Sequence, residues 1–359
     1  PQPGDAALRL SLSDPLSLRA GPLCPGGPEA ANRGGAGRGL SFPVEVMCMP
    51  FIDLHCDTIS RLLNARRTGE AGSLRQADFH IDLEKLKGSG YLLQNFALFV
   101  NLKGGRDPLQ EVLTLADLYW EELANNKDLA QPVLSFADLE AARREKKLGC
   151  LLTVEEGGVC LGRLSLLRTL YRVGVRMLTL TWNYPNELGQ PNGQPGGLTE
   201  TGLVFLEEME RLGMIADVSH LGDDGFWDVA RHAKRPFLAS HSCCRALRDH
   251  RRNLTDEMLK ALADNGGLVG VNFYSAFLGP HEVSRTEDIV RHIRHVVDVG
   301  GEELAALGSD FDGIDCPLEL EDAGHMDRLI RALEQGGFTP RQIERVCWQN
   351  AWDFYERTL

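Results

Sequence analysis

The segment FIDLHCDT (51–58) brings together two residues that could do chemistry. His55 and Asp57 are separated only by Cys56, and they follow an apolar run. In an extended chain, residues i and i+2 point to the same side. We therefore expect the imidazole and the carboxylate to face one spot, which suits a pair of metal ligands.

Further residues that can bind or ionise end other apolar runs. Glu155 ends CLLTVE (150–155), and His220 and His241 end MIADVSH and PFLASH. One buried histidine at such a place is more often structural, but several buried carboxylates that face one another need a cation. A mixture of nitrogen and oxygen donors suits Zn²⁺ or a similar divalent transition metal. The candidate metal ligands are His55, Asp57, Glu155, His220 and His241.

Five ligands exceed the number that one catalytic zinc usually takes. With one bridging carboxylate, they suit a pair of metals about 3.5–4 Å apart. The segment TVEEGG offers both Glu155 and Glu156 as the bridge, and because the two are adjacent, only one of them can face inward. Glu155 directly follows the apolar run and is the predicted bridge, with Glu156 as the alternative.

The apolar runs that position these residues number eight, and near-continuous apolar strands are typical of a parallel sheet covered by helices. They are FIDLH (51–55), YLLQNFALFV (91–100), CLLTVE (150–155), RMLTLTW (176–182), MIADVSH (214–220), PFLASH (236–241), LVGVNFY (268–274) and LAALGSDF (304–311). Between them, amphipathic segments with cap signals predict helices over 108–126, 199–213, 255–267 and 339–359. Eight such alternations predict a (β/α)8 TIM barrel, whose active site lies at the carboxyl ends of the strands.

Composition sets the domain organisation and excludes several classes of partner. Residues 1–46 are rich in Gly, Pro and Ala and are expected to be a disordered extension, and 47–359 a single catalytic domain. The net charge of -13 argues against binding to nucleic acid or anionic membranes. The chain has nine scattered cysteines, and no long apolar run or apolar C-terminal tail. We expect a cytoplasmic protein with reduced thiols and no membrane anchor.

The motifs together identify a family. The chain resembles the renal (membrane) dipeptidase family, the M19 zinc peptidases, and especially its bacterial members, from Phe51 to about Tyr355. The resemblance rests on IDLHCDT, LTVEEGG, MLTLTWNYPN, MIADVSH, ASHSCCRALRDHRRNLTDEML, GGLVGVNFY and GSDFDG, in this order. It implies a (β/α)8 barrel of the metal-dependent, amidohydrolase-like hydrolase type that binds two Zn²⁺ and hydrolyses dipeptides.

The resemblance also implies residue roles. His55 and Asp57 match the first-strand metal pair, Glu155 matches the bridging carboxylate, and His220 and His241 match the ligands of the second metal.

Two further residues match positions that handle the substrate. Arg252 matches the arginine that holds the substrate carboxylate, and Asp310 matches the acidic residue near the scissile bond. Tyr274 either lines the pocket or packs at the barrel rim. Mammalian members carry a substrate-polarising histidine after the LTLT strand, but here Trp182 and Asn183 follow. Asn183, or the metal alone, is then expected to stabilise the transition-state oxygen.

These roles combine into a mechanism. Two metals that share a water would lower its pKa from about 15.7 toward about 7, and the resulting hydroxide, bridging the metals, would attack the peptide carbonyl. Asp310 would carry the proton to the leaving amine, and Arg252 would hold the free C-terminal carboxylate by a two-pronged contact.

Other hypotheses stay open at the level of sequence. The same barrel could serve a different metal-dependent hydrolase, such as an amidase, lactonase or deaminase, or a binding protein that has lost activity. A homodimer is possible by analogy with related enzymes. His232, His250, His292 and His295 are expected on solvated helix or loop faces.

Overall fold

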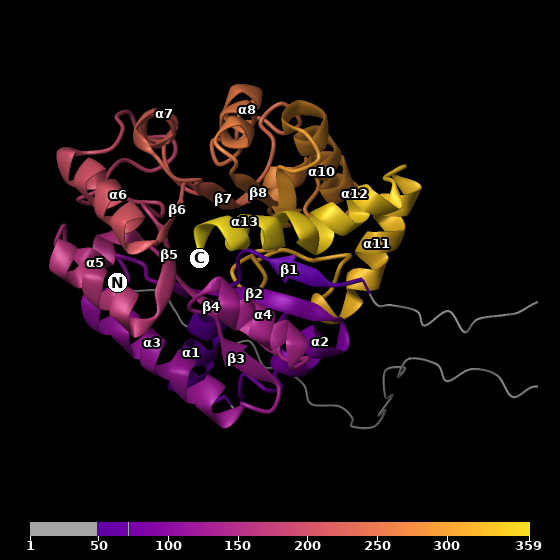
Figure 1. Cartoon of the computed structure of the whole chain (residues 1–359), viewed down its shortest axis with the longest axis horizontal. Coiled ribbons are helices and arrows are strands. Elements are labelled where there is room, and N and C mark those ends of the chain that lie inside the picture. The colour runs from indigo at the N-terminus through magenta and orange to yellow at the C-terminus, as the bar shows by residue number, and fades with distance from the viewer. Residues whose placement is uncertain (1–48, 71) are drawn as a thin grey trace, which may run out of the picture. The chain divides into compact units, whose positions relative to one another are not determined.

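The computed structural model describes residues 49–70 and 72–359, and Figure 1 shows how their helices surround the strands. Eight parallel strands hydrogen-bond in the order β1-β2-β4-β5-β6-β7-β8-β9, and β9 pairs with β1 to close the ring. The strands are β1 (Phe51–Asp53), β2 (Tyr91–Phe99), β4 (Leu148–Glu155), β5 (Val175–Thr179), β6 (Ile215–Asp217), β7 (Leu238–Ser242), β8 (Leu268–Val271) and β9 (Ala305–Leu307). The predicted (β/α)8 barrel is confirmed, and each of the eight predicted runs contains or overlaps one barrel strand.

A ninth strand, β3 (Ala130–Pro132), lies outside the ring. It pairs with the first residues of β4. The later residues of β4 pair with β5 along the same edge. The sequence analysis did not predict β3. Three residues that end in proline carry almost no strand signal, because proline cannot donate a hydrogen bond to a sheet.

The helices follow the cap signals of the sequence. Thr199 and Thr255 accept the expected backbone hydrogen bonds at the starts of α6 and α8, and Gly213 ends α6 in the left-handed conformation, with φ 79°. The helices are α1 (Thr58–Thr68), α2 (Leu83–Gly88), α3 (Pro108–Asn125), α4 (Phe136–Arg144), α5 (Leu164–Val173), α6 (Glu200–Leu212), α7 (Asp223–His232), α8 (Asp256–Asp264), α9 (Ser275–Leu278), α10 (Thr286–Gly300), α11 (Met326–Gln335), α12 (Pro340–Glu344) and α13 (Asn350–Thr358), with short 3₁₀ turns η1 (Gly157–Cys160) and η2 (Ala323–His325).

The predicted closing helix is made of two α-helical parts joined by a π-helical turn, η3 (Arg345–Gln349). After this turn, Asn350 donates hydrogen bonds to the carbonyl oxygens of Glu302 and Ala305, where β9 begins. The Tyr355 hydroxyl bonds the side chain of Asn95 in β2. Helix α13 therefore crosses the barrel at the end where the strands begin (Figure 1) and leaves the opposite end free for a site.

Two seams of the barrel have the shortest backbone pairing, and each is reinforced by a buried aspartate. A single residue pair joins β1 to β9, and a single pair joins β6 to β7. Asp53 accepts hydrogen bonds from the Ser309 hydroxyl (2.5 Å) and backbone N–H (3.0 Å). Asp217 receives the same two bonds from Ser240, at 2.6 and 2.9 Å. These side chains cross-link strands that have few backbone hydrogen bonds between them.

The predicted disordered extension, 1–46, lies outside the described residues, so the domain boundary stays a prediction. Among the helices of the described residues, none combines the length and the apolar character needed to cross a membrane.

Candidate metal centre

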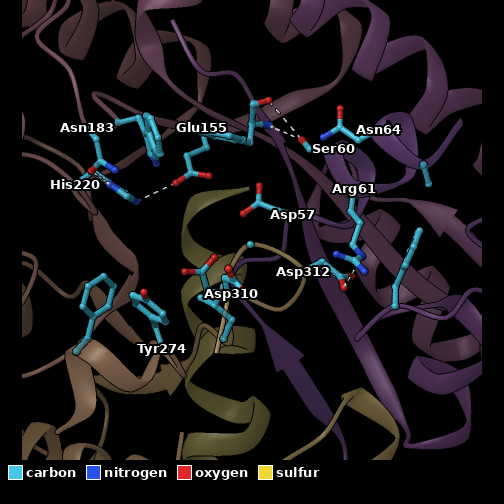
Figure 2. Close-up of a pocket in the computed structure, with 18 of the residues that line it drawn as sticks. Asp57, Ser60, Arg61, Asn64, Glu155, Asn183, His220, Tyr274, Asp310 and Asp312 are labelled. Atoms are coloured by element: carbon cyan, nitrogen blue, oxygen red, sulfur yellow. Dashed lines mark hydrogen bonds and ion pairs between the residues drawn. The ribbon is translucent and has the colours of Figure 1, made fainter. Parts of the chain in front are cut away.

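A cavity of about 600 Å³ opens at the carboxyl ends of the strands. Figure 2 shows that Asp57, Glu155, His220 and Asp310 converge on it, although they are far apart in the sequence. Because the strands are parallel, their carboxyl ends meet at one end of the barrel, and this geometry collects the polar residues that follow them.

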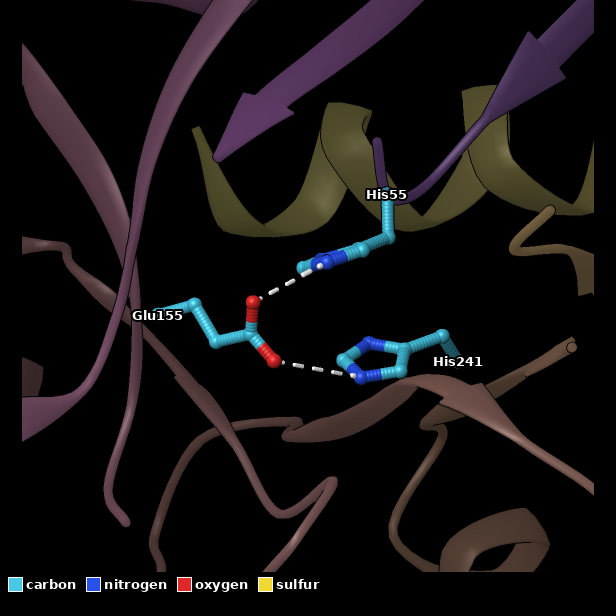
Figure 3. Close-up of side chains that lie close together, drawn as sticks. All are labelled: His55, Glu155 and His241. Atoms are coloured by element: carbon cyan, nitrogen blue, oxygen red, sulfur yellow. Dashed lines mark ion pairs between the residues drawn. The ribbon is translucent and has the colours of Figure 1, made fainter. Parts of the chain in front are cut away.

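Glu155, the last residue of β4, lies at the centre of the cluster, and its two oxygens face different histidines. Oε2 lies 3.4 Å from Nε2 of His55. Oε1 lies 3.0 Å from Nε2 of His220 and 3.5 Å from Nε2 of His241. Figure 3 shows the carboxylate between His55 and His241. This is the arrangement that a carboxylate bridging two cations requires.

Two further carboxylates lie near the same ring nitrogen of His55 that faces Glu155. This nitrogen, Nε2, lies 3.5 Å from Oδ2 of Asp57 and 3.9 Å from Oδ1 of Asp310. His55 and Asp57 thus face one spot, as their spacing in the sequence predicts. Two sets of donors lie close enough together for a metal ion: His55, Glu155 and His241, and His55, Asp57 and Asp310.

Hydrogen bonds at Nδ1 define the tautomers of the other two histidines. The Ser240 hydroxyl donates to Asp217, so it must accept the proton of Nδ1 of His241, at 2.7 Å. Nδ1 of His220 donates to Oδ1 of Asn183 at 2.9 Å. In both rings, Nε2 is left with a lone pair, and the two Nε2 atoms lie 2.9 Å apart. Two lone pairs this close repel each other unless a cation lies between them. A hydrogen bond donated by the other ring nitrogen is also the usual way in which metal-binding histidines are held.

Burial and charge shift the pKa values of the cluster in opposite directions. Burial lowers the pKa of His220 to about 4, and it lowers that of His241 well below its usual range, so both rings are neutral. Burial opposes ionisation of Glu155, but the charge of His55 and the contacts with the other two histidines hold its pKa well below the usual range. Burial raises the pKa of Asp310 to about 8, with Asp57 and Glu155 acting in the same direction and His55 opposing them. So many carboxylates in one buried place favour a bound cation.

The buried polar atoms fit a divalent metal pair. Both ring nitrogens of His55 and Oδ1 of Asp57 are buried and have no hydrogen-bond partner among the described residues. Unpaired buried polar atoms are costly unless something binds them. Gly313 approaches the same place so closely that a Cβ there would overlap the carboxylates of Asp57 and Asp310. The GSDFDG motif therefore needs glycine at this position.

Glu156 is buried but points away from the cluster. Its carboxylate accepts hydrogen bonds from the backbone of Gly158 (2.7 Å) and Trp182 (3.2 Å), and from the Asn186 side chain (2.5 Å). Glu156 therefore fixes the start of the long loop between β5 and α6, in which Asn192 N also donates to the carbonyl oxygen of His220 at 2.7 Å. The loop is therefore tied to the strand ends.

The predicted substrate-binding residues have different surroundings. Tyr274 and Asn183 both line the cavity, and the side-chain oxygen of Asn183 is already engaged by His220. Arg252 is buried and is not among the lining residues: its guanidinium donates to the His241 carbonyl oxygen at 3.1 Å, and Phe277 lies over it at 5.3 Å. Its Nε has no partner among the described residues.

Sequence reasoning missed the supporting residues. Asp217 and Ser240 set the tautomer of His241, and Asn272 holds Oδ2 of Asp310 at 2.8 Å. One signal was present: an aspartate stands two residues before His55 and three before His220, near the end of its strand in each case. His292 was assigned wrongly. It is fully buried, where it accepts from Cys244 N and donates to the Leu278 carbonyl oxygen.

Comparisons of sequence identify related proteins. A family model described as membrane dipeptidase, peptidase family M19, matches residues 45–356. An uncharacterized protein from the pqqA 5′ region of Klebsiella pneumoniae is 39% identical over 254 residues, which cover 65% of this chain and 93% of that protein. An uncharacterized dipeptidase of Schizosaccharomyces pombe is 32% identical over 300 residues, which cover 78% of this chain and 72% of that protein.

Solved structures share the fold over most of both chains. A metallo peptidase from Rhodobacter sphaeroides, liganded with a phosphinate mimic of the dipeptide L-Ala-D-Ala, has a TM-score of 0.81 and 27% identity, covering 87% of this chain and 100% of its own. An amidohydrolase from Pseudomonas aeruginosa has a TM-score of 0.71 and 25% identity, covering 77% of this chain and 91% of its own.

Proposed function

The chain belongs to the membrane dipeptidase family, peptidase family M19, and on that premise we propose that it is a dizinc dipeptidase that hydrolyses the peptide bond of dipeptides. The observation that carries this proposal is the position of Glu155, whose two oxygens face His55 on one side and the His220–His241 pair on the other. His55, Asp57 and Glu155 would hold one zinc ion, and Glu155, His220 and His241 the other.

In the proposed reaction, the zinc ions and the side chains of the protein have different roles. When bound, two zinc ions would supply Lewis acidity, lowering the pKa of water toward about 7 and withdrawing charge from the peptide carbonyl. Asp310 would take the proton of the attacking water and pass it to the leaving amine. Asn272 supports this role, because it holds one oxygen of Asp310 at 2.8 Å and leaves the other turned toward His55.

The substrate's free carboxylate would be held on the side of the cavity that Tyr274 lines. Arg252 is buried against Phe277, which packs beside Tyr274, and among the described residues no acidic side chain is within ion-pair distance of it. Such a cation favours an anionic group nearby, and within the described part of the chain only two of its five N–H donors have partners within hydrogen-bond distance. A fixed distance between the metals and a bound carboxylate would explain a preference for dipeptides over longer chains.

A hydrolysis assay with metal-depleted and zinc-reconstituted protein tests the function. We expect the depleted protein to be inactive toward dipeptides and zinc to restore hydrolysis, with about two ions bound per chain. An N-acyl amino acid, a lactone and a deaminase substrate should be assayed in parallel. Hydrolysis of one of these in place of dipeptides would favour another hydrolase on the same barrel, and full activity of metal-free protein would refute the proposal.

A further inference from the structure

One face of helix α1 lines the cavity from the metal centre outward. The helix starts directly after Asp57, which is its N-cap residue, and Ser60, Arg61, Asn64 and Thr68 also line the cavity. Positions three, four and seven residues apart lie on one helix face. At a rise of about 1.5 Å per residue, Arg61 lies about 6 Å and Asn64 about 10 Å along the helix from Asp57. The cavity therefore continues past the candidate metal ligands along α1, over a distance that suits an amino-acid side chain.

Arg61 supplies the positive charge of this extension. It is the only arginine or lysine among the described residues that line the cavity, whereas six of the lining residues are acidic. Asp57, Glu155 and Asp310 belong to the metal cluster and would be balanced by bound cations, whereas Glu70, Asp312 and Asp315 lie outside it and leave Arg61 as a single cationic point on an otherwise acidic outer wall. Figure 2 shows its side chain beside Asp57 and Asp312.

The guanidinium of Arg61 is largely available to a ligand. Its nearest acidic atom among the described residues is Oδ1 of Asp312, 3.9 Å from Nε, which is too long for a hydrogen bond. Asp312 itself already accepts hydrogen bonds from the Thr58 hydroxyl (2.7 Å) and from His80 N (2.8 Å). Phe79 packs against the guanidinium at 4.9 Å and holds it in place. The side chain of Asn64 is exposed and has no hydrogen-bond partner in the described part of the chain.

The position of Arg61 indicates which part of a dipeptide it would meet. In Figure 2, Tyr274 and Arg61 lie on opposite sides of Asp57. If the C-terminal carboxylate is bound on the Tyr274 side, with the peptide bond at the metals, then the N-terminal residue extends toward α1.

We propose that Arg61 and Asn64 form a specificity subsite that selects dipeptides with an acidic N-terminal side chain. The inference rests on the proposed dipeptidase function and adds the substrate class. A glutamate or aspartate side chain that enters this extension would meet the planar donors of Arg61, which match a carboxylate in two places. Asn64, one helical turn farther out, would donate to a second oxygen.

Matched dipeptides measure this preference. Values of kcat/KM for glutamyl-, glutaminyl-, leucyl- and lysyl-alanine should be determined with the zinc-loaded enzyme. Glutamyl and glutaminyl side chains have the same shape, so their ratio isolates the charge. Because Arg61 is half-exposed, we expect glutamyl-alanine to be favoured over glutaminyl-alanine by about three- to tenfold at low salt, and less at high salt.

Substitutions assign the preference to Arg61. Arg61→Ala should bring the glutamyl-to-glutaminyl ratio close to one, and Arg61→Glu should favour lysyl-alanine. Arg144→Ala is the matched control: this arginine is exposed at the end of α4, outside the cavity, and its loss should leave the ratio as in the wild type.

Two results would contradict the proposed subsite, and a third would contradict the proposed dipeptidase function as well. If the wild type shows no preference, or if Arg61→Ala lowers all four rates equally, Arg61 only balances the charge of Asp312. If the zinc-loaded enzyme hydrolyses none of the four dipeptides, the proposed function fails together with the subsite.

Discussion

At the scale of single residues, the adjacent glutamates give a direct test of the metal centre. Glu155→Gln should lower the metal content and abolish most of kcat, because an amide bridges two cations poorly. Glu156→Gln should keep the metal content, since its carboxylate accepts hydrogen bonds from Gly158 in η1 and from the β5–α6 loop, and not from the cluster. Metal analysis of both purified variants, together with hydrolysis rates, separates them. The reverse order of effects would mean that Glu156 is the bridge.

Arg252 gives a residue-level test of how substrate is held. Arg252→Ala should lower kcat/KM about ten- to several-hundred-fold, because a charge-assisted contact is lost, and should leave the metal content intact. Arg252→Lys should recover part of the loss. A dipeptide with an amidated C-terminus should be a poor substrate for wild type and little worse for the variant. The neighbouring exposed Arg251→Ala is the control. Equal losses on the acid and the amide would point to a purely structural role for Arg252.

At the scale of elements, the short β1–β9 seam should depend on its aspartate–serine cross-link. Ser309→Ala removes the hydroxyl that donates to Asp53 at 2.5 Å and leaves a buried carboxylate with one partner fewer. We expect the free energy of unfolding to fall by about 1–3 kcal/mol. Urea unfolding followed by circular dichroism measures this, with the exposed Ser165→Ala as control. An unchanged stability would show that backbone pairing alone holds the seam.

His292 joins α10 to the segment after β7 and should make stability depend on pH. Burial lowers its pKa to about 4, whereas the unfolded chain has an ordinary value near 6.5. Protons therefore favour the unfolded state, and the stability that is present above about pH 6.5 is lost as pH falls toward about 4. That difference corresponds to roughly 3 kcal/mol.

The measurement compares urea midpoints of metal-free wild type and His292→Gln at several pH values between 7 and 4. The glutamine amide can replace both hydrogen bonds, so the variant should lose less stability on acidification. Parallel pH profiles for the two proteins would mean that His292 is not the group responsible.

At the scale of the whole molecule, the metal centre connects strands from different parts of the ring. His55 follows β1, Glu155 ends β4, His220 follows β6 and His241 lies in β7, so bound cations would tie these elements together. Ligands that bind only the folded state stabilise it by mass action, by about 2.7 kcal/mol at a hundredfold excess over Kd. We expect zinc to raise Tm by several degrees, and a chelator to reverse the effect.

Thermal scans of two variants check that this stabilisation comes from the proposed ligands. His241→Ala should lose most of the zinc-induced shift in Tm. The exposed His281→Ala should keep it. If both variants respond to zinc as the wild type does, the cations bind elsewhere.

The sequence by itself determined the barrel and the composition of its polar end. Eight apolar runs, alternating with helices, leave a parallel closed sheet as the arrangement that buries them, and the polar residues after each run must then meet at one end. The spacing of His55 and Asp57 was also sufficient to predict that their side chains face one spot, because residues i and i+2 of an extended segment point to the same side whatever the rest of the fold. Strand ends were less predictable: the runs at 304–311 and 51–55 extend beyond β9 and β1.

Only the tertiary structure decided what depends on partners from distant strands. The tautomer of His241 is set by Ser240 and Asp217, and the burial of His292 by packing against the segment after β7. Ser240 adjoins His241 in the sequence, but Asp217, which takes the proton of the Ser240 hydroxyl, lies on another strand, and Cys244 is far from His292 in the sequence. Arg61 likewise looks like an ordinary helical surface charge, until folding brings its side of α1 to the cavity. Local spacing fixes which side chains face together within a segment, whereas hydrogen-bond partners and cavity walls are fixed by contacts between segments that only the closed barrel creates.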